Sequence, residues 1–442
     1  MLGATEDLEQ LAETCLATAK VIKDHLSKNG HPQMSFDENG PPTFPEVPPN
    51  IQYARLTLRE SAQRLLDLVA GPEENVGFYS YYIVHDLNAF RYVHRYGIAS
   101  AIPFNDTITY NDLARKCDVD AGQLKQMLRQ LMQLRIFRES VPGQVGHTAA
   151  SKHLTHPGAL YFNQYCSINA FDYVAKQIDA LERWGHGSQE PNQAALNYAH
   201  DTDKSMYDYY EENGEVRERF SNLMTYVSKM DAMSNAYVAA GFDWAALGEV
   251  TIVDVAGNMG HCSVPIAKAN PKAKIIVQDL PNIIKRAKDP ETCVVPKELR
   301  SRFDFMAHDF YDPQPVKVDV FFVRMIMHDY SDEYCIRILK PLVAALKPGG
   351  RIMIMDSILP PVGGAPAPIE RFLRAQDLQM LVLTNAKERD SEQWNDLIKA
   401  TDPGLKINSV TLPPGSAMAM IEVILEAKAH GQAAKVRSNG RA

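Results

Sequence analysis

Acidic and aromatic residues follow apolar runs in the second half of the chain, where the strands of a sheet would end. In IIVQDLP, residues 275–281, Asp279 closes such a run, and a carboxylate there can accept hydrogen bonds from both hydroxyls of a ribose. When Asp279 is considered alone, a role as the cap of a helix that begins near Pro281 explains it equally well. In MAHDFYD, Asp309 and Phe310 offer a polar edge and an aromatic face, which are what an adenine requires. Together with Asp254 at a third strand end, they favour a nucleoside ligand over three separate caps.

The stretch TIVDVAGNMGHCSVPIAKANP, residues 251–271, is typical of a ligand-binding loop between a strand and a helix. Where glycines are common at alternate positions of such a loop, this chain has Ala256, Asn258 and Gly260. Alanine is tolerable there if its backbone φ is negative, and asparagine is among the residues that best tolerate a positive φ. We therefore expect the loop still to approach a nucleotide-like ligand.

Several other chemistries are excluded by motifs that the sequence lacks. It has no GxxxxGK P-loop, no GxGxxG, no GxSxG and no HExxH. Its six cysteines include no CxxC pair, which fits neither a disulfide framework nor a zinc site, and we expect no metal. No run of about 18 apolar residues is present, and acids occur early in the chain. We therefore expect no membrane span and no signal peptide, and a cytoplasmic location.

The elements that position these residues are strands and helices in alternation. From Trp244 onward the strand-like runs VTIVDVAG, AKIIVQDL, RFDFMAHDF, VDVFFVRMIM, GRIMIMDSIL and AMAMIEVILEA alternate with helix-like stretches. Such alternation predicts a parallel, doubly wound sheet with helices on both faces, here over residues 241–430. Ligands of these sheets bind at the carboxyl ends of the strands, where His328, Asp329 and Asp356 also fall.

The first half of the chain reads as mainly helical. Residues 1–55 suggest a helix and an arm, 156–240 an aromatic-rich helical connector, and 431–442 a disordered tail. Within 56–155, a helix, a turn, a second helix and a glycine-tipped hairpin form a winged-helix pattern. The net charge of −8 and the acids near the second helix argue against nucleic acid as a partner. A structural or dimerising role is the better interpretation.

Five ordered segments resemble the S-adenosylmethionine (SAM) domain of the caffeate-type O-methyltransferases, specifically their fungal secondary-metabolism branch. VDVAGNMGHCS resembles the glycine loop of the family, VQDLP its ribose-binding segment and AHDFYDPQPV its adenine-binding segment. VFFVRMIMHDYSDEYCIRILKPLVAALKPGGRIMIMDSILP resembles its catalytic block, and LQMLVLTNAKERDSEQW its closing active-site segment. The resemblance extends to the SFDENGPPTFP arm and the winged-helix domain, and covers nearly the whole chain.

The resemblance implies an α/β fold: a Rossmann-like, doubly wound SAM-binding domain after an N-terminal, mainly helical, winged-helix dimerisation domain. It also implies a homodimer and SAM as the cofactor. The residues placed at the cofactor are Asp254, Gly257, Gly260, Asp279, Leu280, Asp309, Phe310 and Arg324. At the reaction centre it implies His328 as the general base, with Asp329 beside it. Asp356 and Glu388 match two carboxylates that flank this base, and Asp356 is shorter than the glutamate of many plant members.

Three functions remain open at this point. An intact His328–Asp329 pair with Asp356 and Glu388 favours methyl transfer to a hydroxyl of an aromatic or polyketide-type secondary metabolite. Some fungal members of the family instead act as pericyclases on polyketide-pyridones and do not consume SAM. A weakened glycine loop is compatible with this second function. A binding protein without catalysis ranks last.

Adaptable apolar side chains, which line a predicted substrate pocket or else belong to ordinary core, are Met224, Met325, Met327, Met380 and Phe171.

Overall fold

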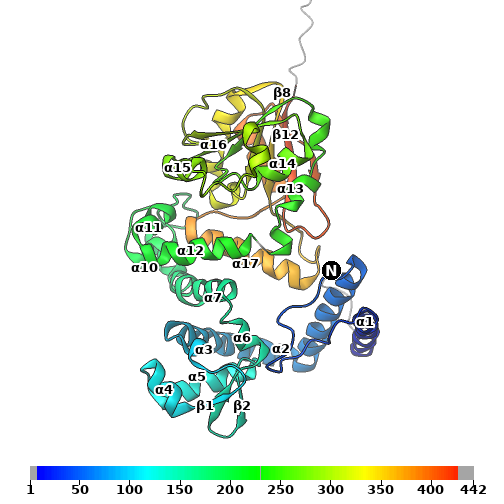
Figure 1. Ribbon diagram of the computed structural model, residues 1–442, viewed down its shortest axis with the longest axis vertical. Coiled ribbons are helices and arrows are strands. Elements are labelled where there is room, and N and C mark those ends of the chain that lie inside the picture. Colours follow the sequence, from blue (N-terminus) through cyan, green and yellow to red (C-terminus); the bar gives the residue numbers. More distant parts are fainter. Residues whose placement is uncertain (1–6, 229, 427–442) are drawn as a thin grey trace, which may run out of the picture. The chain divides into compact units, whose positions relative to one another are not determined.

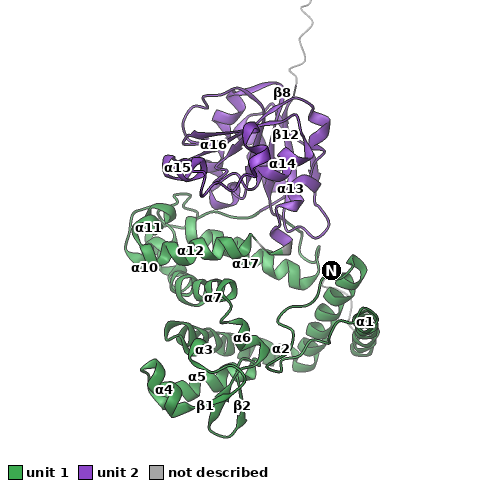
Figure 2. Cartoon of the chain, viewed as in Figure 1, with its two compact units in different colours: residues 1–230, 359–388 green, residues 231–358, 389–442 purple. Residues whose placement is uncertain are grey.

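The computed structural model describes residues 7–228 and 230–426, and the chain divides into two compact units (Figures 1 and 2). The helical unit comprises residues 1–230 and 359–388, and the sheet unit comprises residues 231–358 and 389–442. The predicted tail at 431–442 lies outside the described residues.

The sheet unit contains a seven-stranded mixed sheet with the strand order β11-β12-β8-β7-β4-β5-β6. The bounds of its strands are β4 Thr251–Val255, β5 Lys274–Asp279, β6 Phe303–Ala307, β7 Val318–Arg324, β8 Leu346–Asp356, β11 Leu405–Thr411 and β12 Ala419–Leu425. The helices of this unit are α13 Ala236–Ala240, α14 Ser263–Ala269, α15 Pro281–Lys288, α16 Asp332–Ala344 and α18 Ser391–Thr401. Shorter elements are η2 Asp231–Met233, η3 Trp244–Leu247, η4 Lys297–Arg302, η5 Met327–Asp329, β9 Ile358–Leu359 and β10 Arg389–Asp390.

The central strands are apolar along most of their length because both faces of the sheet are covered. Neighbouring residues of β7 point to opposite faces: Phe321 joins the core formed with α16 and α18, and Phe322 contacts the ring of Trp244. Both phenylalanines are fully buried. The doubly wound architecture predicted from the alternating runs is therefore confirmed.

One strand runs against the others. β12 pairs antiparallel with both β8 and β11, whereas β4, β5, β6, β7 and β8 pair in parallel. The link from β11 to β12 spans only residues 412–418, which is too short for the crossover that parallel strands need.

The order of the strands reverses at β4. The chain passes from β4 outward to β5 and β6, then returns to pair β7 with the other side of β4. In open α/β sheets, ligands bind at the carboxyl ends of the strands that flank such a switch point. The loop after β4 and the residues after β7 therefore define the expected site.

The helical unit is built from one small sheet and a series of helices. Its helices are α1 Leu8–Lys28, α2 Pro49–Arg95, α3 Ile98–Ala101, α4 Tyr110–Cys117, α5 Ala121–Gln133, α6 Ala149–His153, α7 Pro157–Gln164, α8 Phe171–Val174, α9 Gln177–Trp184, α10 Ala195–His200, α11 Met206–Glu212, α12 Gly214–Val227 and α17 Ala367–Thr384. A π-helical turn, η1 Tyr165–Ala170, joins α7 to α8. The small sheet has the order β1-β3-β2, with β1 Thr107–Thr109, β2 Arg138–Val141 and β3 Gln144–Gly146.

Local signals explain two features of this unit. α2 is interrupted at Gly71, whose φ of 73° and ψ of 169° are not helical, and helical structure resumes at Pro72. Thr109 caps α4 and Asp120 caps α5, each through a side-chain oxygen that accepts a backbone N–H of the first turn. The two capped helices and the β2–β3 hairpin form the helix, turn, helix and wing of the predicted pattern.

Residues 359–388 belong to the helical unit, although the sequence reads as one continuous domain over 241–430. The apolar side of α17 explains the difference. Met380, Val382 and Leu383 are buried in a core shared with α8, α10 and α11. The sheet unit resumes at Arg389.

Candidate active site

The loop after β4 has a left-handed backbone at three positions. φ is +52° at Ala256, +52° at Asn258 and +84° at Gly260. The condition stated above for Ala256, a negative φ, is not met, so this alanine occupies a conformation that costs about 1–2 kcal/mol relative to glycine. The loop therefore keeps its backbone path although two of the glycines are absent.

Two glycines of the loop allow it to pack closely against neighbouring side chains. A β-carbon at Gly257 would lie 2.4 Å from the carboxyl carbon of Asp254, and one at Gly260 would lie 3.0 Å from Val277. The Gly257 N–H donates to the carbonyl of Gln278 at 3.0 Å. The loop thus folds tightly over the ends of β4 and β5, as a cradle for a ligand requires.

Asp254 lies beneath this loop and is almost fully buried. Its Oδ2 accepts a 2.7 Å hydrogen bond from the hydroxyl of Ser263 at the start of α14. Burial raises the pKa of Asp254 to about 7, against the opposing effect of this hydrogen bond. In the structure, Asp254 supports the loop from below. Ser263 was not among the predicted site residues, because a serine at a helix start reads equally well as an ordinary cap.

Asp279 connects the ends of two strands. Its Oδ2 accepts the backbone N–H of Asn258 at 2.8 Å, and its Oδ1 accepts the N–H of Leu280 at 2.8 Å. α15 begins after Leu280 and has no side-chain cap, so Asp279 does not cap that helix. Burial raises the pKa of Asp279, against these two hydrogen bonds. A carboxylate has about four acceptor positions, so capacity remains for the hydroxyls of a ribose.

The end of β6 carries the predicted adenine residues. Asp309 is exposed, and its Oδ1 accepts the N–H of Tyr311 at 2.9 Å. The ring of Phe310 is half-buried, with its centroid 4.8 Å from that of Tyr311 and 5.7 Å from that of Tyr330. Leu280, at the end of β5, is 51% exposed. A polar edge and apolar faces are thus available at the ends of β5 and β6.

Arg324 ends β7 and ties the site to α14 and η2. Its Nη2 donates to the carbonyl of Met233 at 2.8 Å, and its Nη1 contacts the thiol of Cys262 at 3.3 Å. Within the described residues, its buried Nε has no hydrogen-bond partner. Its positive charge acts on Asp254, whose pKa it lowers against the effect of burial.

His328 lies in η5, a three-residue 3₁₀ turn just beyond β7, and is 8% exposed. Its Nε2 is 3.6 Å from Oδ1 of Asp329. Asp356, fully buried at the end of β8, accepts the backbone N–H of Met327 on its Oδ2 at 3.2 Å. The structure therefore brings His328, Asp329 and Asp356 to neighbouring strand ends beside the switch point.

Glu388 is the last residue of the helical unit and is 2% exposed. Gln376 of α17 donates its Nε2–H to Oε1 of Glu388 at 2.5 Å, and the N–H of Glu388 donates to Oδ1 of Asp377 at 2.9 Å. Burial raises the pKa of Asp377. The sequence did not single out Gln376 or Asp377, because both read as polar positions of an amphipathic helix.

The five predicted substrate residues differ in burial. Met327 is fully buried in the sheet-unit core and Met380 is 9% exposed in the helical-unit core, as ordinary core residues would be. Met224 is 37% exposed, and Phe171 packs beneath the guanidinium of Arg91. Met325 follows β7 with a φ of +53°, so its backbone, like that of Ala256, is left-handed at the switch point.

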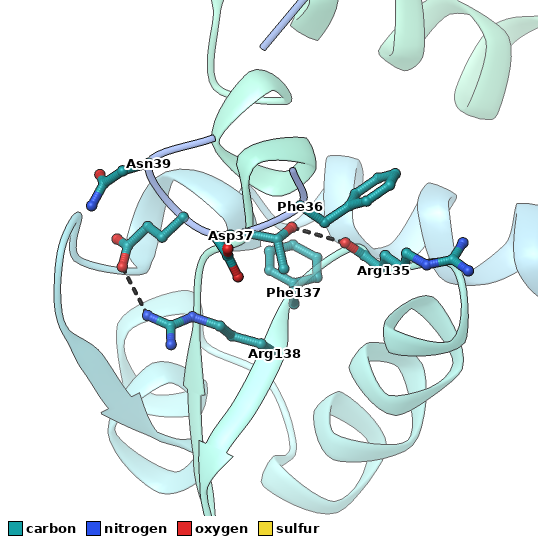
Figure 3. Close-up of a pocket in the computed structure, with 8 residues that line it drawn as sticks. Phe36, Asp37, Asn39, Arg135, Phe137 and Arg138 are labelled. Carbon is teal, nitrogen blue, oxygen red and sulfur yellow. Dashed lines mark hydrogen bonds and ion pairs between the residues drawn. The ribbon is translucent and has the colours of Figure 1, made fainter. Parts of the chain in front are cut away.

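A cavity of about 490 Å³ lies elsewhere, between the arm and the wing of the helical unit (Figure 3). Glu38 of the arm pairs with Arg138 at 2.8 Å and accepts the N–H of Asn105 at 2.5 Å. Burial opposes these contacts, which together with Lys152 lower the pKa of Glu38. This carboxylate anchors the arm to the winged-helix elements.

None of the helices in residues 7–228 and 230–426 is long and apolar enough to cross a membrane. In the same described ranges, no three His, Cys, Asp or Glu side chains are grouped as a metal site would need.

Residues 185–402 match a family described as the O-methyltransferase domain. The O-methyltransferase VdtC of Byssochlamys spectabilis is 35% identical over 424 residues, which cover 94% of this chain and 98% of VdtC. The fold resembles that of OxaC in complex with SAH and oxaline, with a TM-score of 0.71, 21% identity and coverage of 95% and 99%. It also resembles a structure titled "A Pericyclic Reaction enzyme", with a TM-score of 0.67, 20% identity and coverage of 94% and 100%.

Proposed function

Because this chain belongs to the fungal O-methyltransferase family, we propose that it methylates a hydroxyl of an aromatic or polyketide-type secondary metabolite. The family assignment makes SAM the cofactor. The observation that carries the proposal is the turn at the switch point. In this turn His328 lies beside Asp329 and follows Met327, whose backbone N–H donates to Asp356. An imidazole placed there is suited to general-base chemistry near neutral pH.

The residues at the strand ends fit SAM. Asp279 retains acceptor positions for ribose hydroxyls, Gly257 and Gly260 let the loop pack tightly over the ends of β4 and β5, and Phe310 offers a face to adenine. The unpaired Nε of Arg324, among the described residues, is a further donor in this region. When bound, SAM supplies a methyl group that is attached to a positively charged sulfur. The sulfur is the leaving group, because it becomes a neutral thioether.

With SAM bound, the imidazole of His328 would take the proton from the substrate hydroxyl, whose oxygen would receive the methyl group as the carbon–sulfur bond breaks. Asp329, 3.6 Å from Nε2, becomes an ion-pair partner when the imidazole gains that proton. Holding the hydroxyl oxygen close to the methyl carbon does much of the remaining work. Glu388, which the family resemblance assigns as a second carboxylate, is held within the helical unit by Gln376 and Asp377.

A second function of the same family is a pericyclic reaction in which SAM is not consumed. The observation that favours it is the loop at Ala256, where a strained alanine replaces a glycine and is expected to weaken cofactor affinity. A likeness of fold to a pericyclic enzyme is compatible with this function. The complete set of His328, Asp329, Asp356 and Glu388 makes methyl transfer the better-supported choice.

Cofactor stoichiometry tests the choice between the two functions. The protein is incubated with methyl-labelled SAM and a panel of phenols and pyridone polyketides, and both label transfer and unlabelled isomerisation are followed. One demethylated cofactor per product supports methyl transfer. Many turnovers on a single unconsumed SAM would establish the pericyclic function instead.

We also propose a homodimer formed by the helical unit. Between Leu66 and Val84, α2 exposes large apolar side chains that a monomer rarely leaves in water. These side chains are Leu66, Leu68, Val69, Val76, Phe78, Tyr79, Tyr81, Tyr82, Ile83 and Val84. Leu68 is 40% exposed, and the others are 45–78% exposed. A second copy of the same helix is the simplest partner for this surface.

A further inference from the structure

Arg389 is a fully buried arginine that directly follows Glu388 in the chain. Its Nη1 donates to the carbonyl of Met327 at 2.8 Å, and its Nη2 donates to the carbonyl of Tyr330 at 2.9 Å. These two carbonyls flank His328 and Asp329. One guanidinium thus binds the turn on both sides of the base.

The turn needs such a donor. η5 contains only three residues, so its hydrogen-bond ladder ends once the N–H of Tyr330 has donated to the carbonyl of Met327, at a long 3.3 Å. Buried carbonyls without donors cost free energy, and the thiol of Cys335, 3.1 Å from the Met327 oxygen, is only a weak donor. The planar fork of an arginine can reach two carbonyls at once, which the single ammonium of a lysine cannot do with the same geometry.

The charge of Arg389 is compensated within the same cluster. Its Nε and Nη2 lie 2.9 Å and 2.8 Å from Oδ1 of Asp332, the first residue of α16. On the other side of the turn, Asp356 accepts the N–H of Met327. The peptide groups around His328 are therefore held by a carboxylate at an N–H and by a guanidinium at two carbonyls.

We propose that Arg389 is a positioning residue that sets the orientation of the His328 imidazole through the backbone of η5. This inference rests on the proposed function for the role of His328 as base, while the hydrogen bonds themselves do not depend on it. Replacement of the fork is expected to let the turn relax and to move the imidazole away from its place beside Asp329.

A purely structural arginine provides the matched control. Arg302 donates from Nη1 to the carbonyl of Asn270 at 2.9 Å and from Nη2 to that of Ala267 at 2.6 Å, in the same unit but at the end of α14. Arg302→Lys therefore loses the same kind of contact without touching η5. A comparison of Arg389→Lys with Arg302→Lys separates positioning from general destabilisation.

The experiment measures four properties of the full chain for each variant. They are the melting temperature, the affinity for S-adenosylhomocysteine (SAH, the demethylated cofactor) by calorimetry, the methylation of a panel of simple phenols with SAM, and the titration of the His328 imidazole by ¹³C-histidine NMR. The His328 signal is assigned with His328→Asn. Arg389→Lys should leave SAH affinity unchanged, lower kcat about 10–100-fold and shift the titration of His328. Arg302→Lys should lose comparable thermal stability and leave both kcat and the His328 titration unchanged.

An unchanged His328 titration in Arg389→Lys, or an equal change in Arg302→Lys, would overturn the proposal. If Arg389→Lys does not fold, Asp332→Asn takes its place, because it removes the charge of the carboxylate that orients the guanidinium. Asp332→Asn should shift the titration of His328 in the same direction as Arg389→Lys, by a smaller amount. If the wild-type protein methylates no phenol, the assigned reaction loses support, while the NMR comparison still decides whether Arg389 positions His328.

Discussion

The backbone N–H of Asn258 donates to Oδ2 of Asp279 at 2.8 Å, so the loop after β4 and the end of β5 form one hydrogen-bonded assembly. Asp279 holds the loop in the structure, and in the proposed function it also offers acceptors to the ribose of the cofactor. Removal of its carboxylate should affect both.

Asp279→Ala should weaken SAH binding by about 1–3 kcal/mol, because ribose hydroxyls lose their acceptor and the loop loses its tie. Isothermal titration calorimetry measures the change. Asp304→Ala, at an exposed position of the adjacent strand β6, is the control and should bind as the wild type does. An affinity unaffected by the Asp279 change would restrict this residue to a structural role.

Ala256→Gly should raise the free energy of unfolding by about 0.5–1 kcal/mol, because glycine adopts the left-handed backbone without the steric cost of a β-carbon. The gain is partly offset by the greater freedom of glycine in the unfolded chain. Ala400→Gly, at an exposed site in α18, should instead lower stability by about 0.5–1 kcal/mol. Urea unfolding of both variants tests the pair, and equal losses would mean that Ala256 is not strained.

His328→Asn should lower the rate of methyl transfer by about 10²–10⁴-fold while SAH affinity stays near that of the wild type. The proposed base acts as the proton leaves the substrate, so its loss should affect kcat more than cofactor binding. Single-turnover assays with labelled SAM measure the rate. A variant that keeps full activity would remove His328 from the reaction.

Glu139→Gln should destabilise the wing at neutral pH but not in strong acid. Hydrogen bonds from Arg129, the Gly143 N–H and Tyr110 lower the pKa of Glu139 from 4.5 to about 2. A lowered pKa stabilises the folded state above pH 4.5, and this contribution disappears as the pH falls toward 2.

The difference in unfolding free energy between the wild type and Glu139→Gln should therefore be largest near neutral pH and shrink below pH 4.5. Glu392→Gln, an exposed residue in the first turn of α18, serves as the control. A difference that does not vary with pH would show that the charge of Glu139 contributes nothing.

Val76→Asp combined with Tyr82→Asp should convert the dimer to a monomer, because two charges would be buried in an apolar interface. Light scattering at micromolar concentration reports the mass. Leu412→Asp, which changes a residue that is 62% exposed between β11 and β12, should stay dimeric. A wild-type protein that is already monomeric would refute the dimer.

The features that the sequence predicted are those whose signals are local. Apolar runs such as VDVFFVR are buried on both faces and form central strands. β11 was missed because LKINSVT buries only Leu405 and shows no continuous apolar run. An edge strand of this kind lacks the pattern that makes a central strand readable.

Other features depend on contacts that are distant in sequence. The left-handed φ of Ala256 contradicts the preference of alanine and results from the tight fold over Asp254 and Gln278. Arg389 reads as a surface arginine until its partners at Met327 and Tyr330 are known. The position of residues 359–388 in the helical unit likewise depends on packing between segments far apart in the chain.

The divided helical unit has a consequence for synthesis on the ribosome. The chain leaves this unit at residue 230 and returns at 359–388, after the parallel strands β4 to β8 have been made. At about 5–20 residues per second, the core that receives Met380 and Leu383 waits roughly 8–30 seconds for α17 to emerge. The sheet unit in turn waits for β11 and β12 at the end of the chain. Neither unit can finish folding before most of the protein has been translated, so a nascent chain exposes two incomplete cores that chaperones would have to shield.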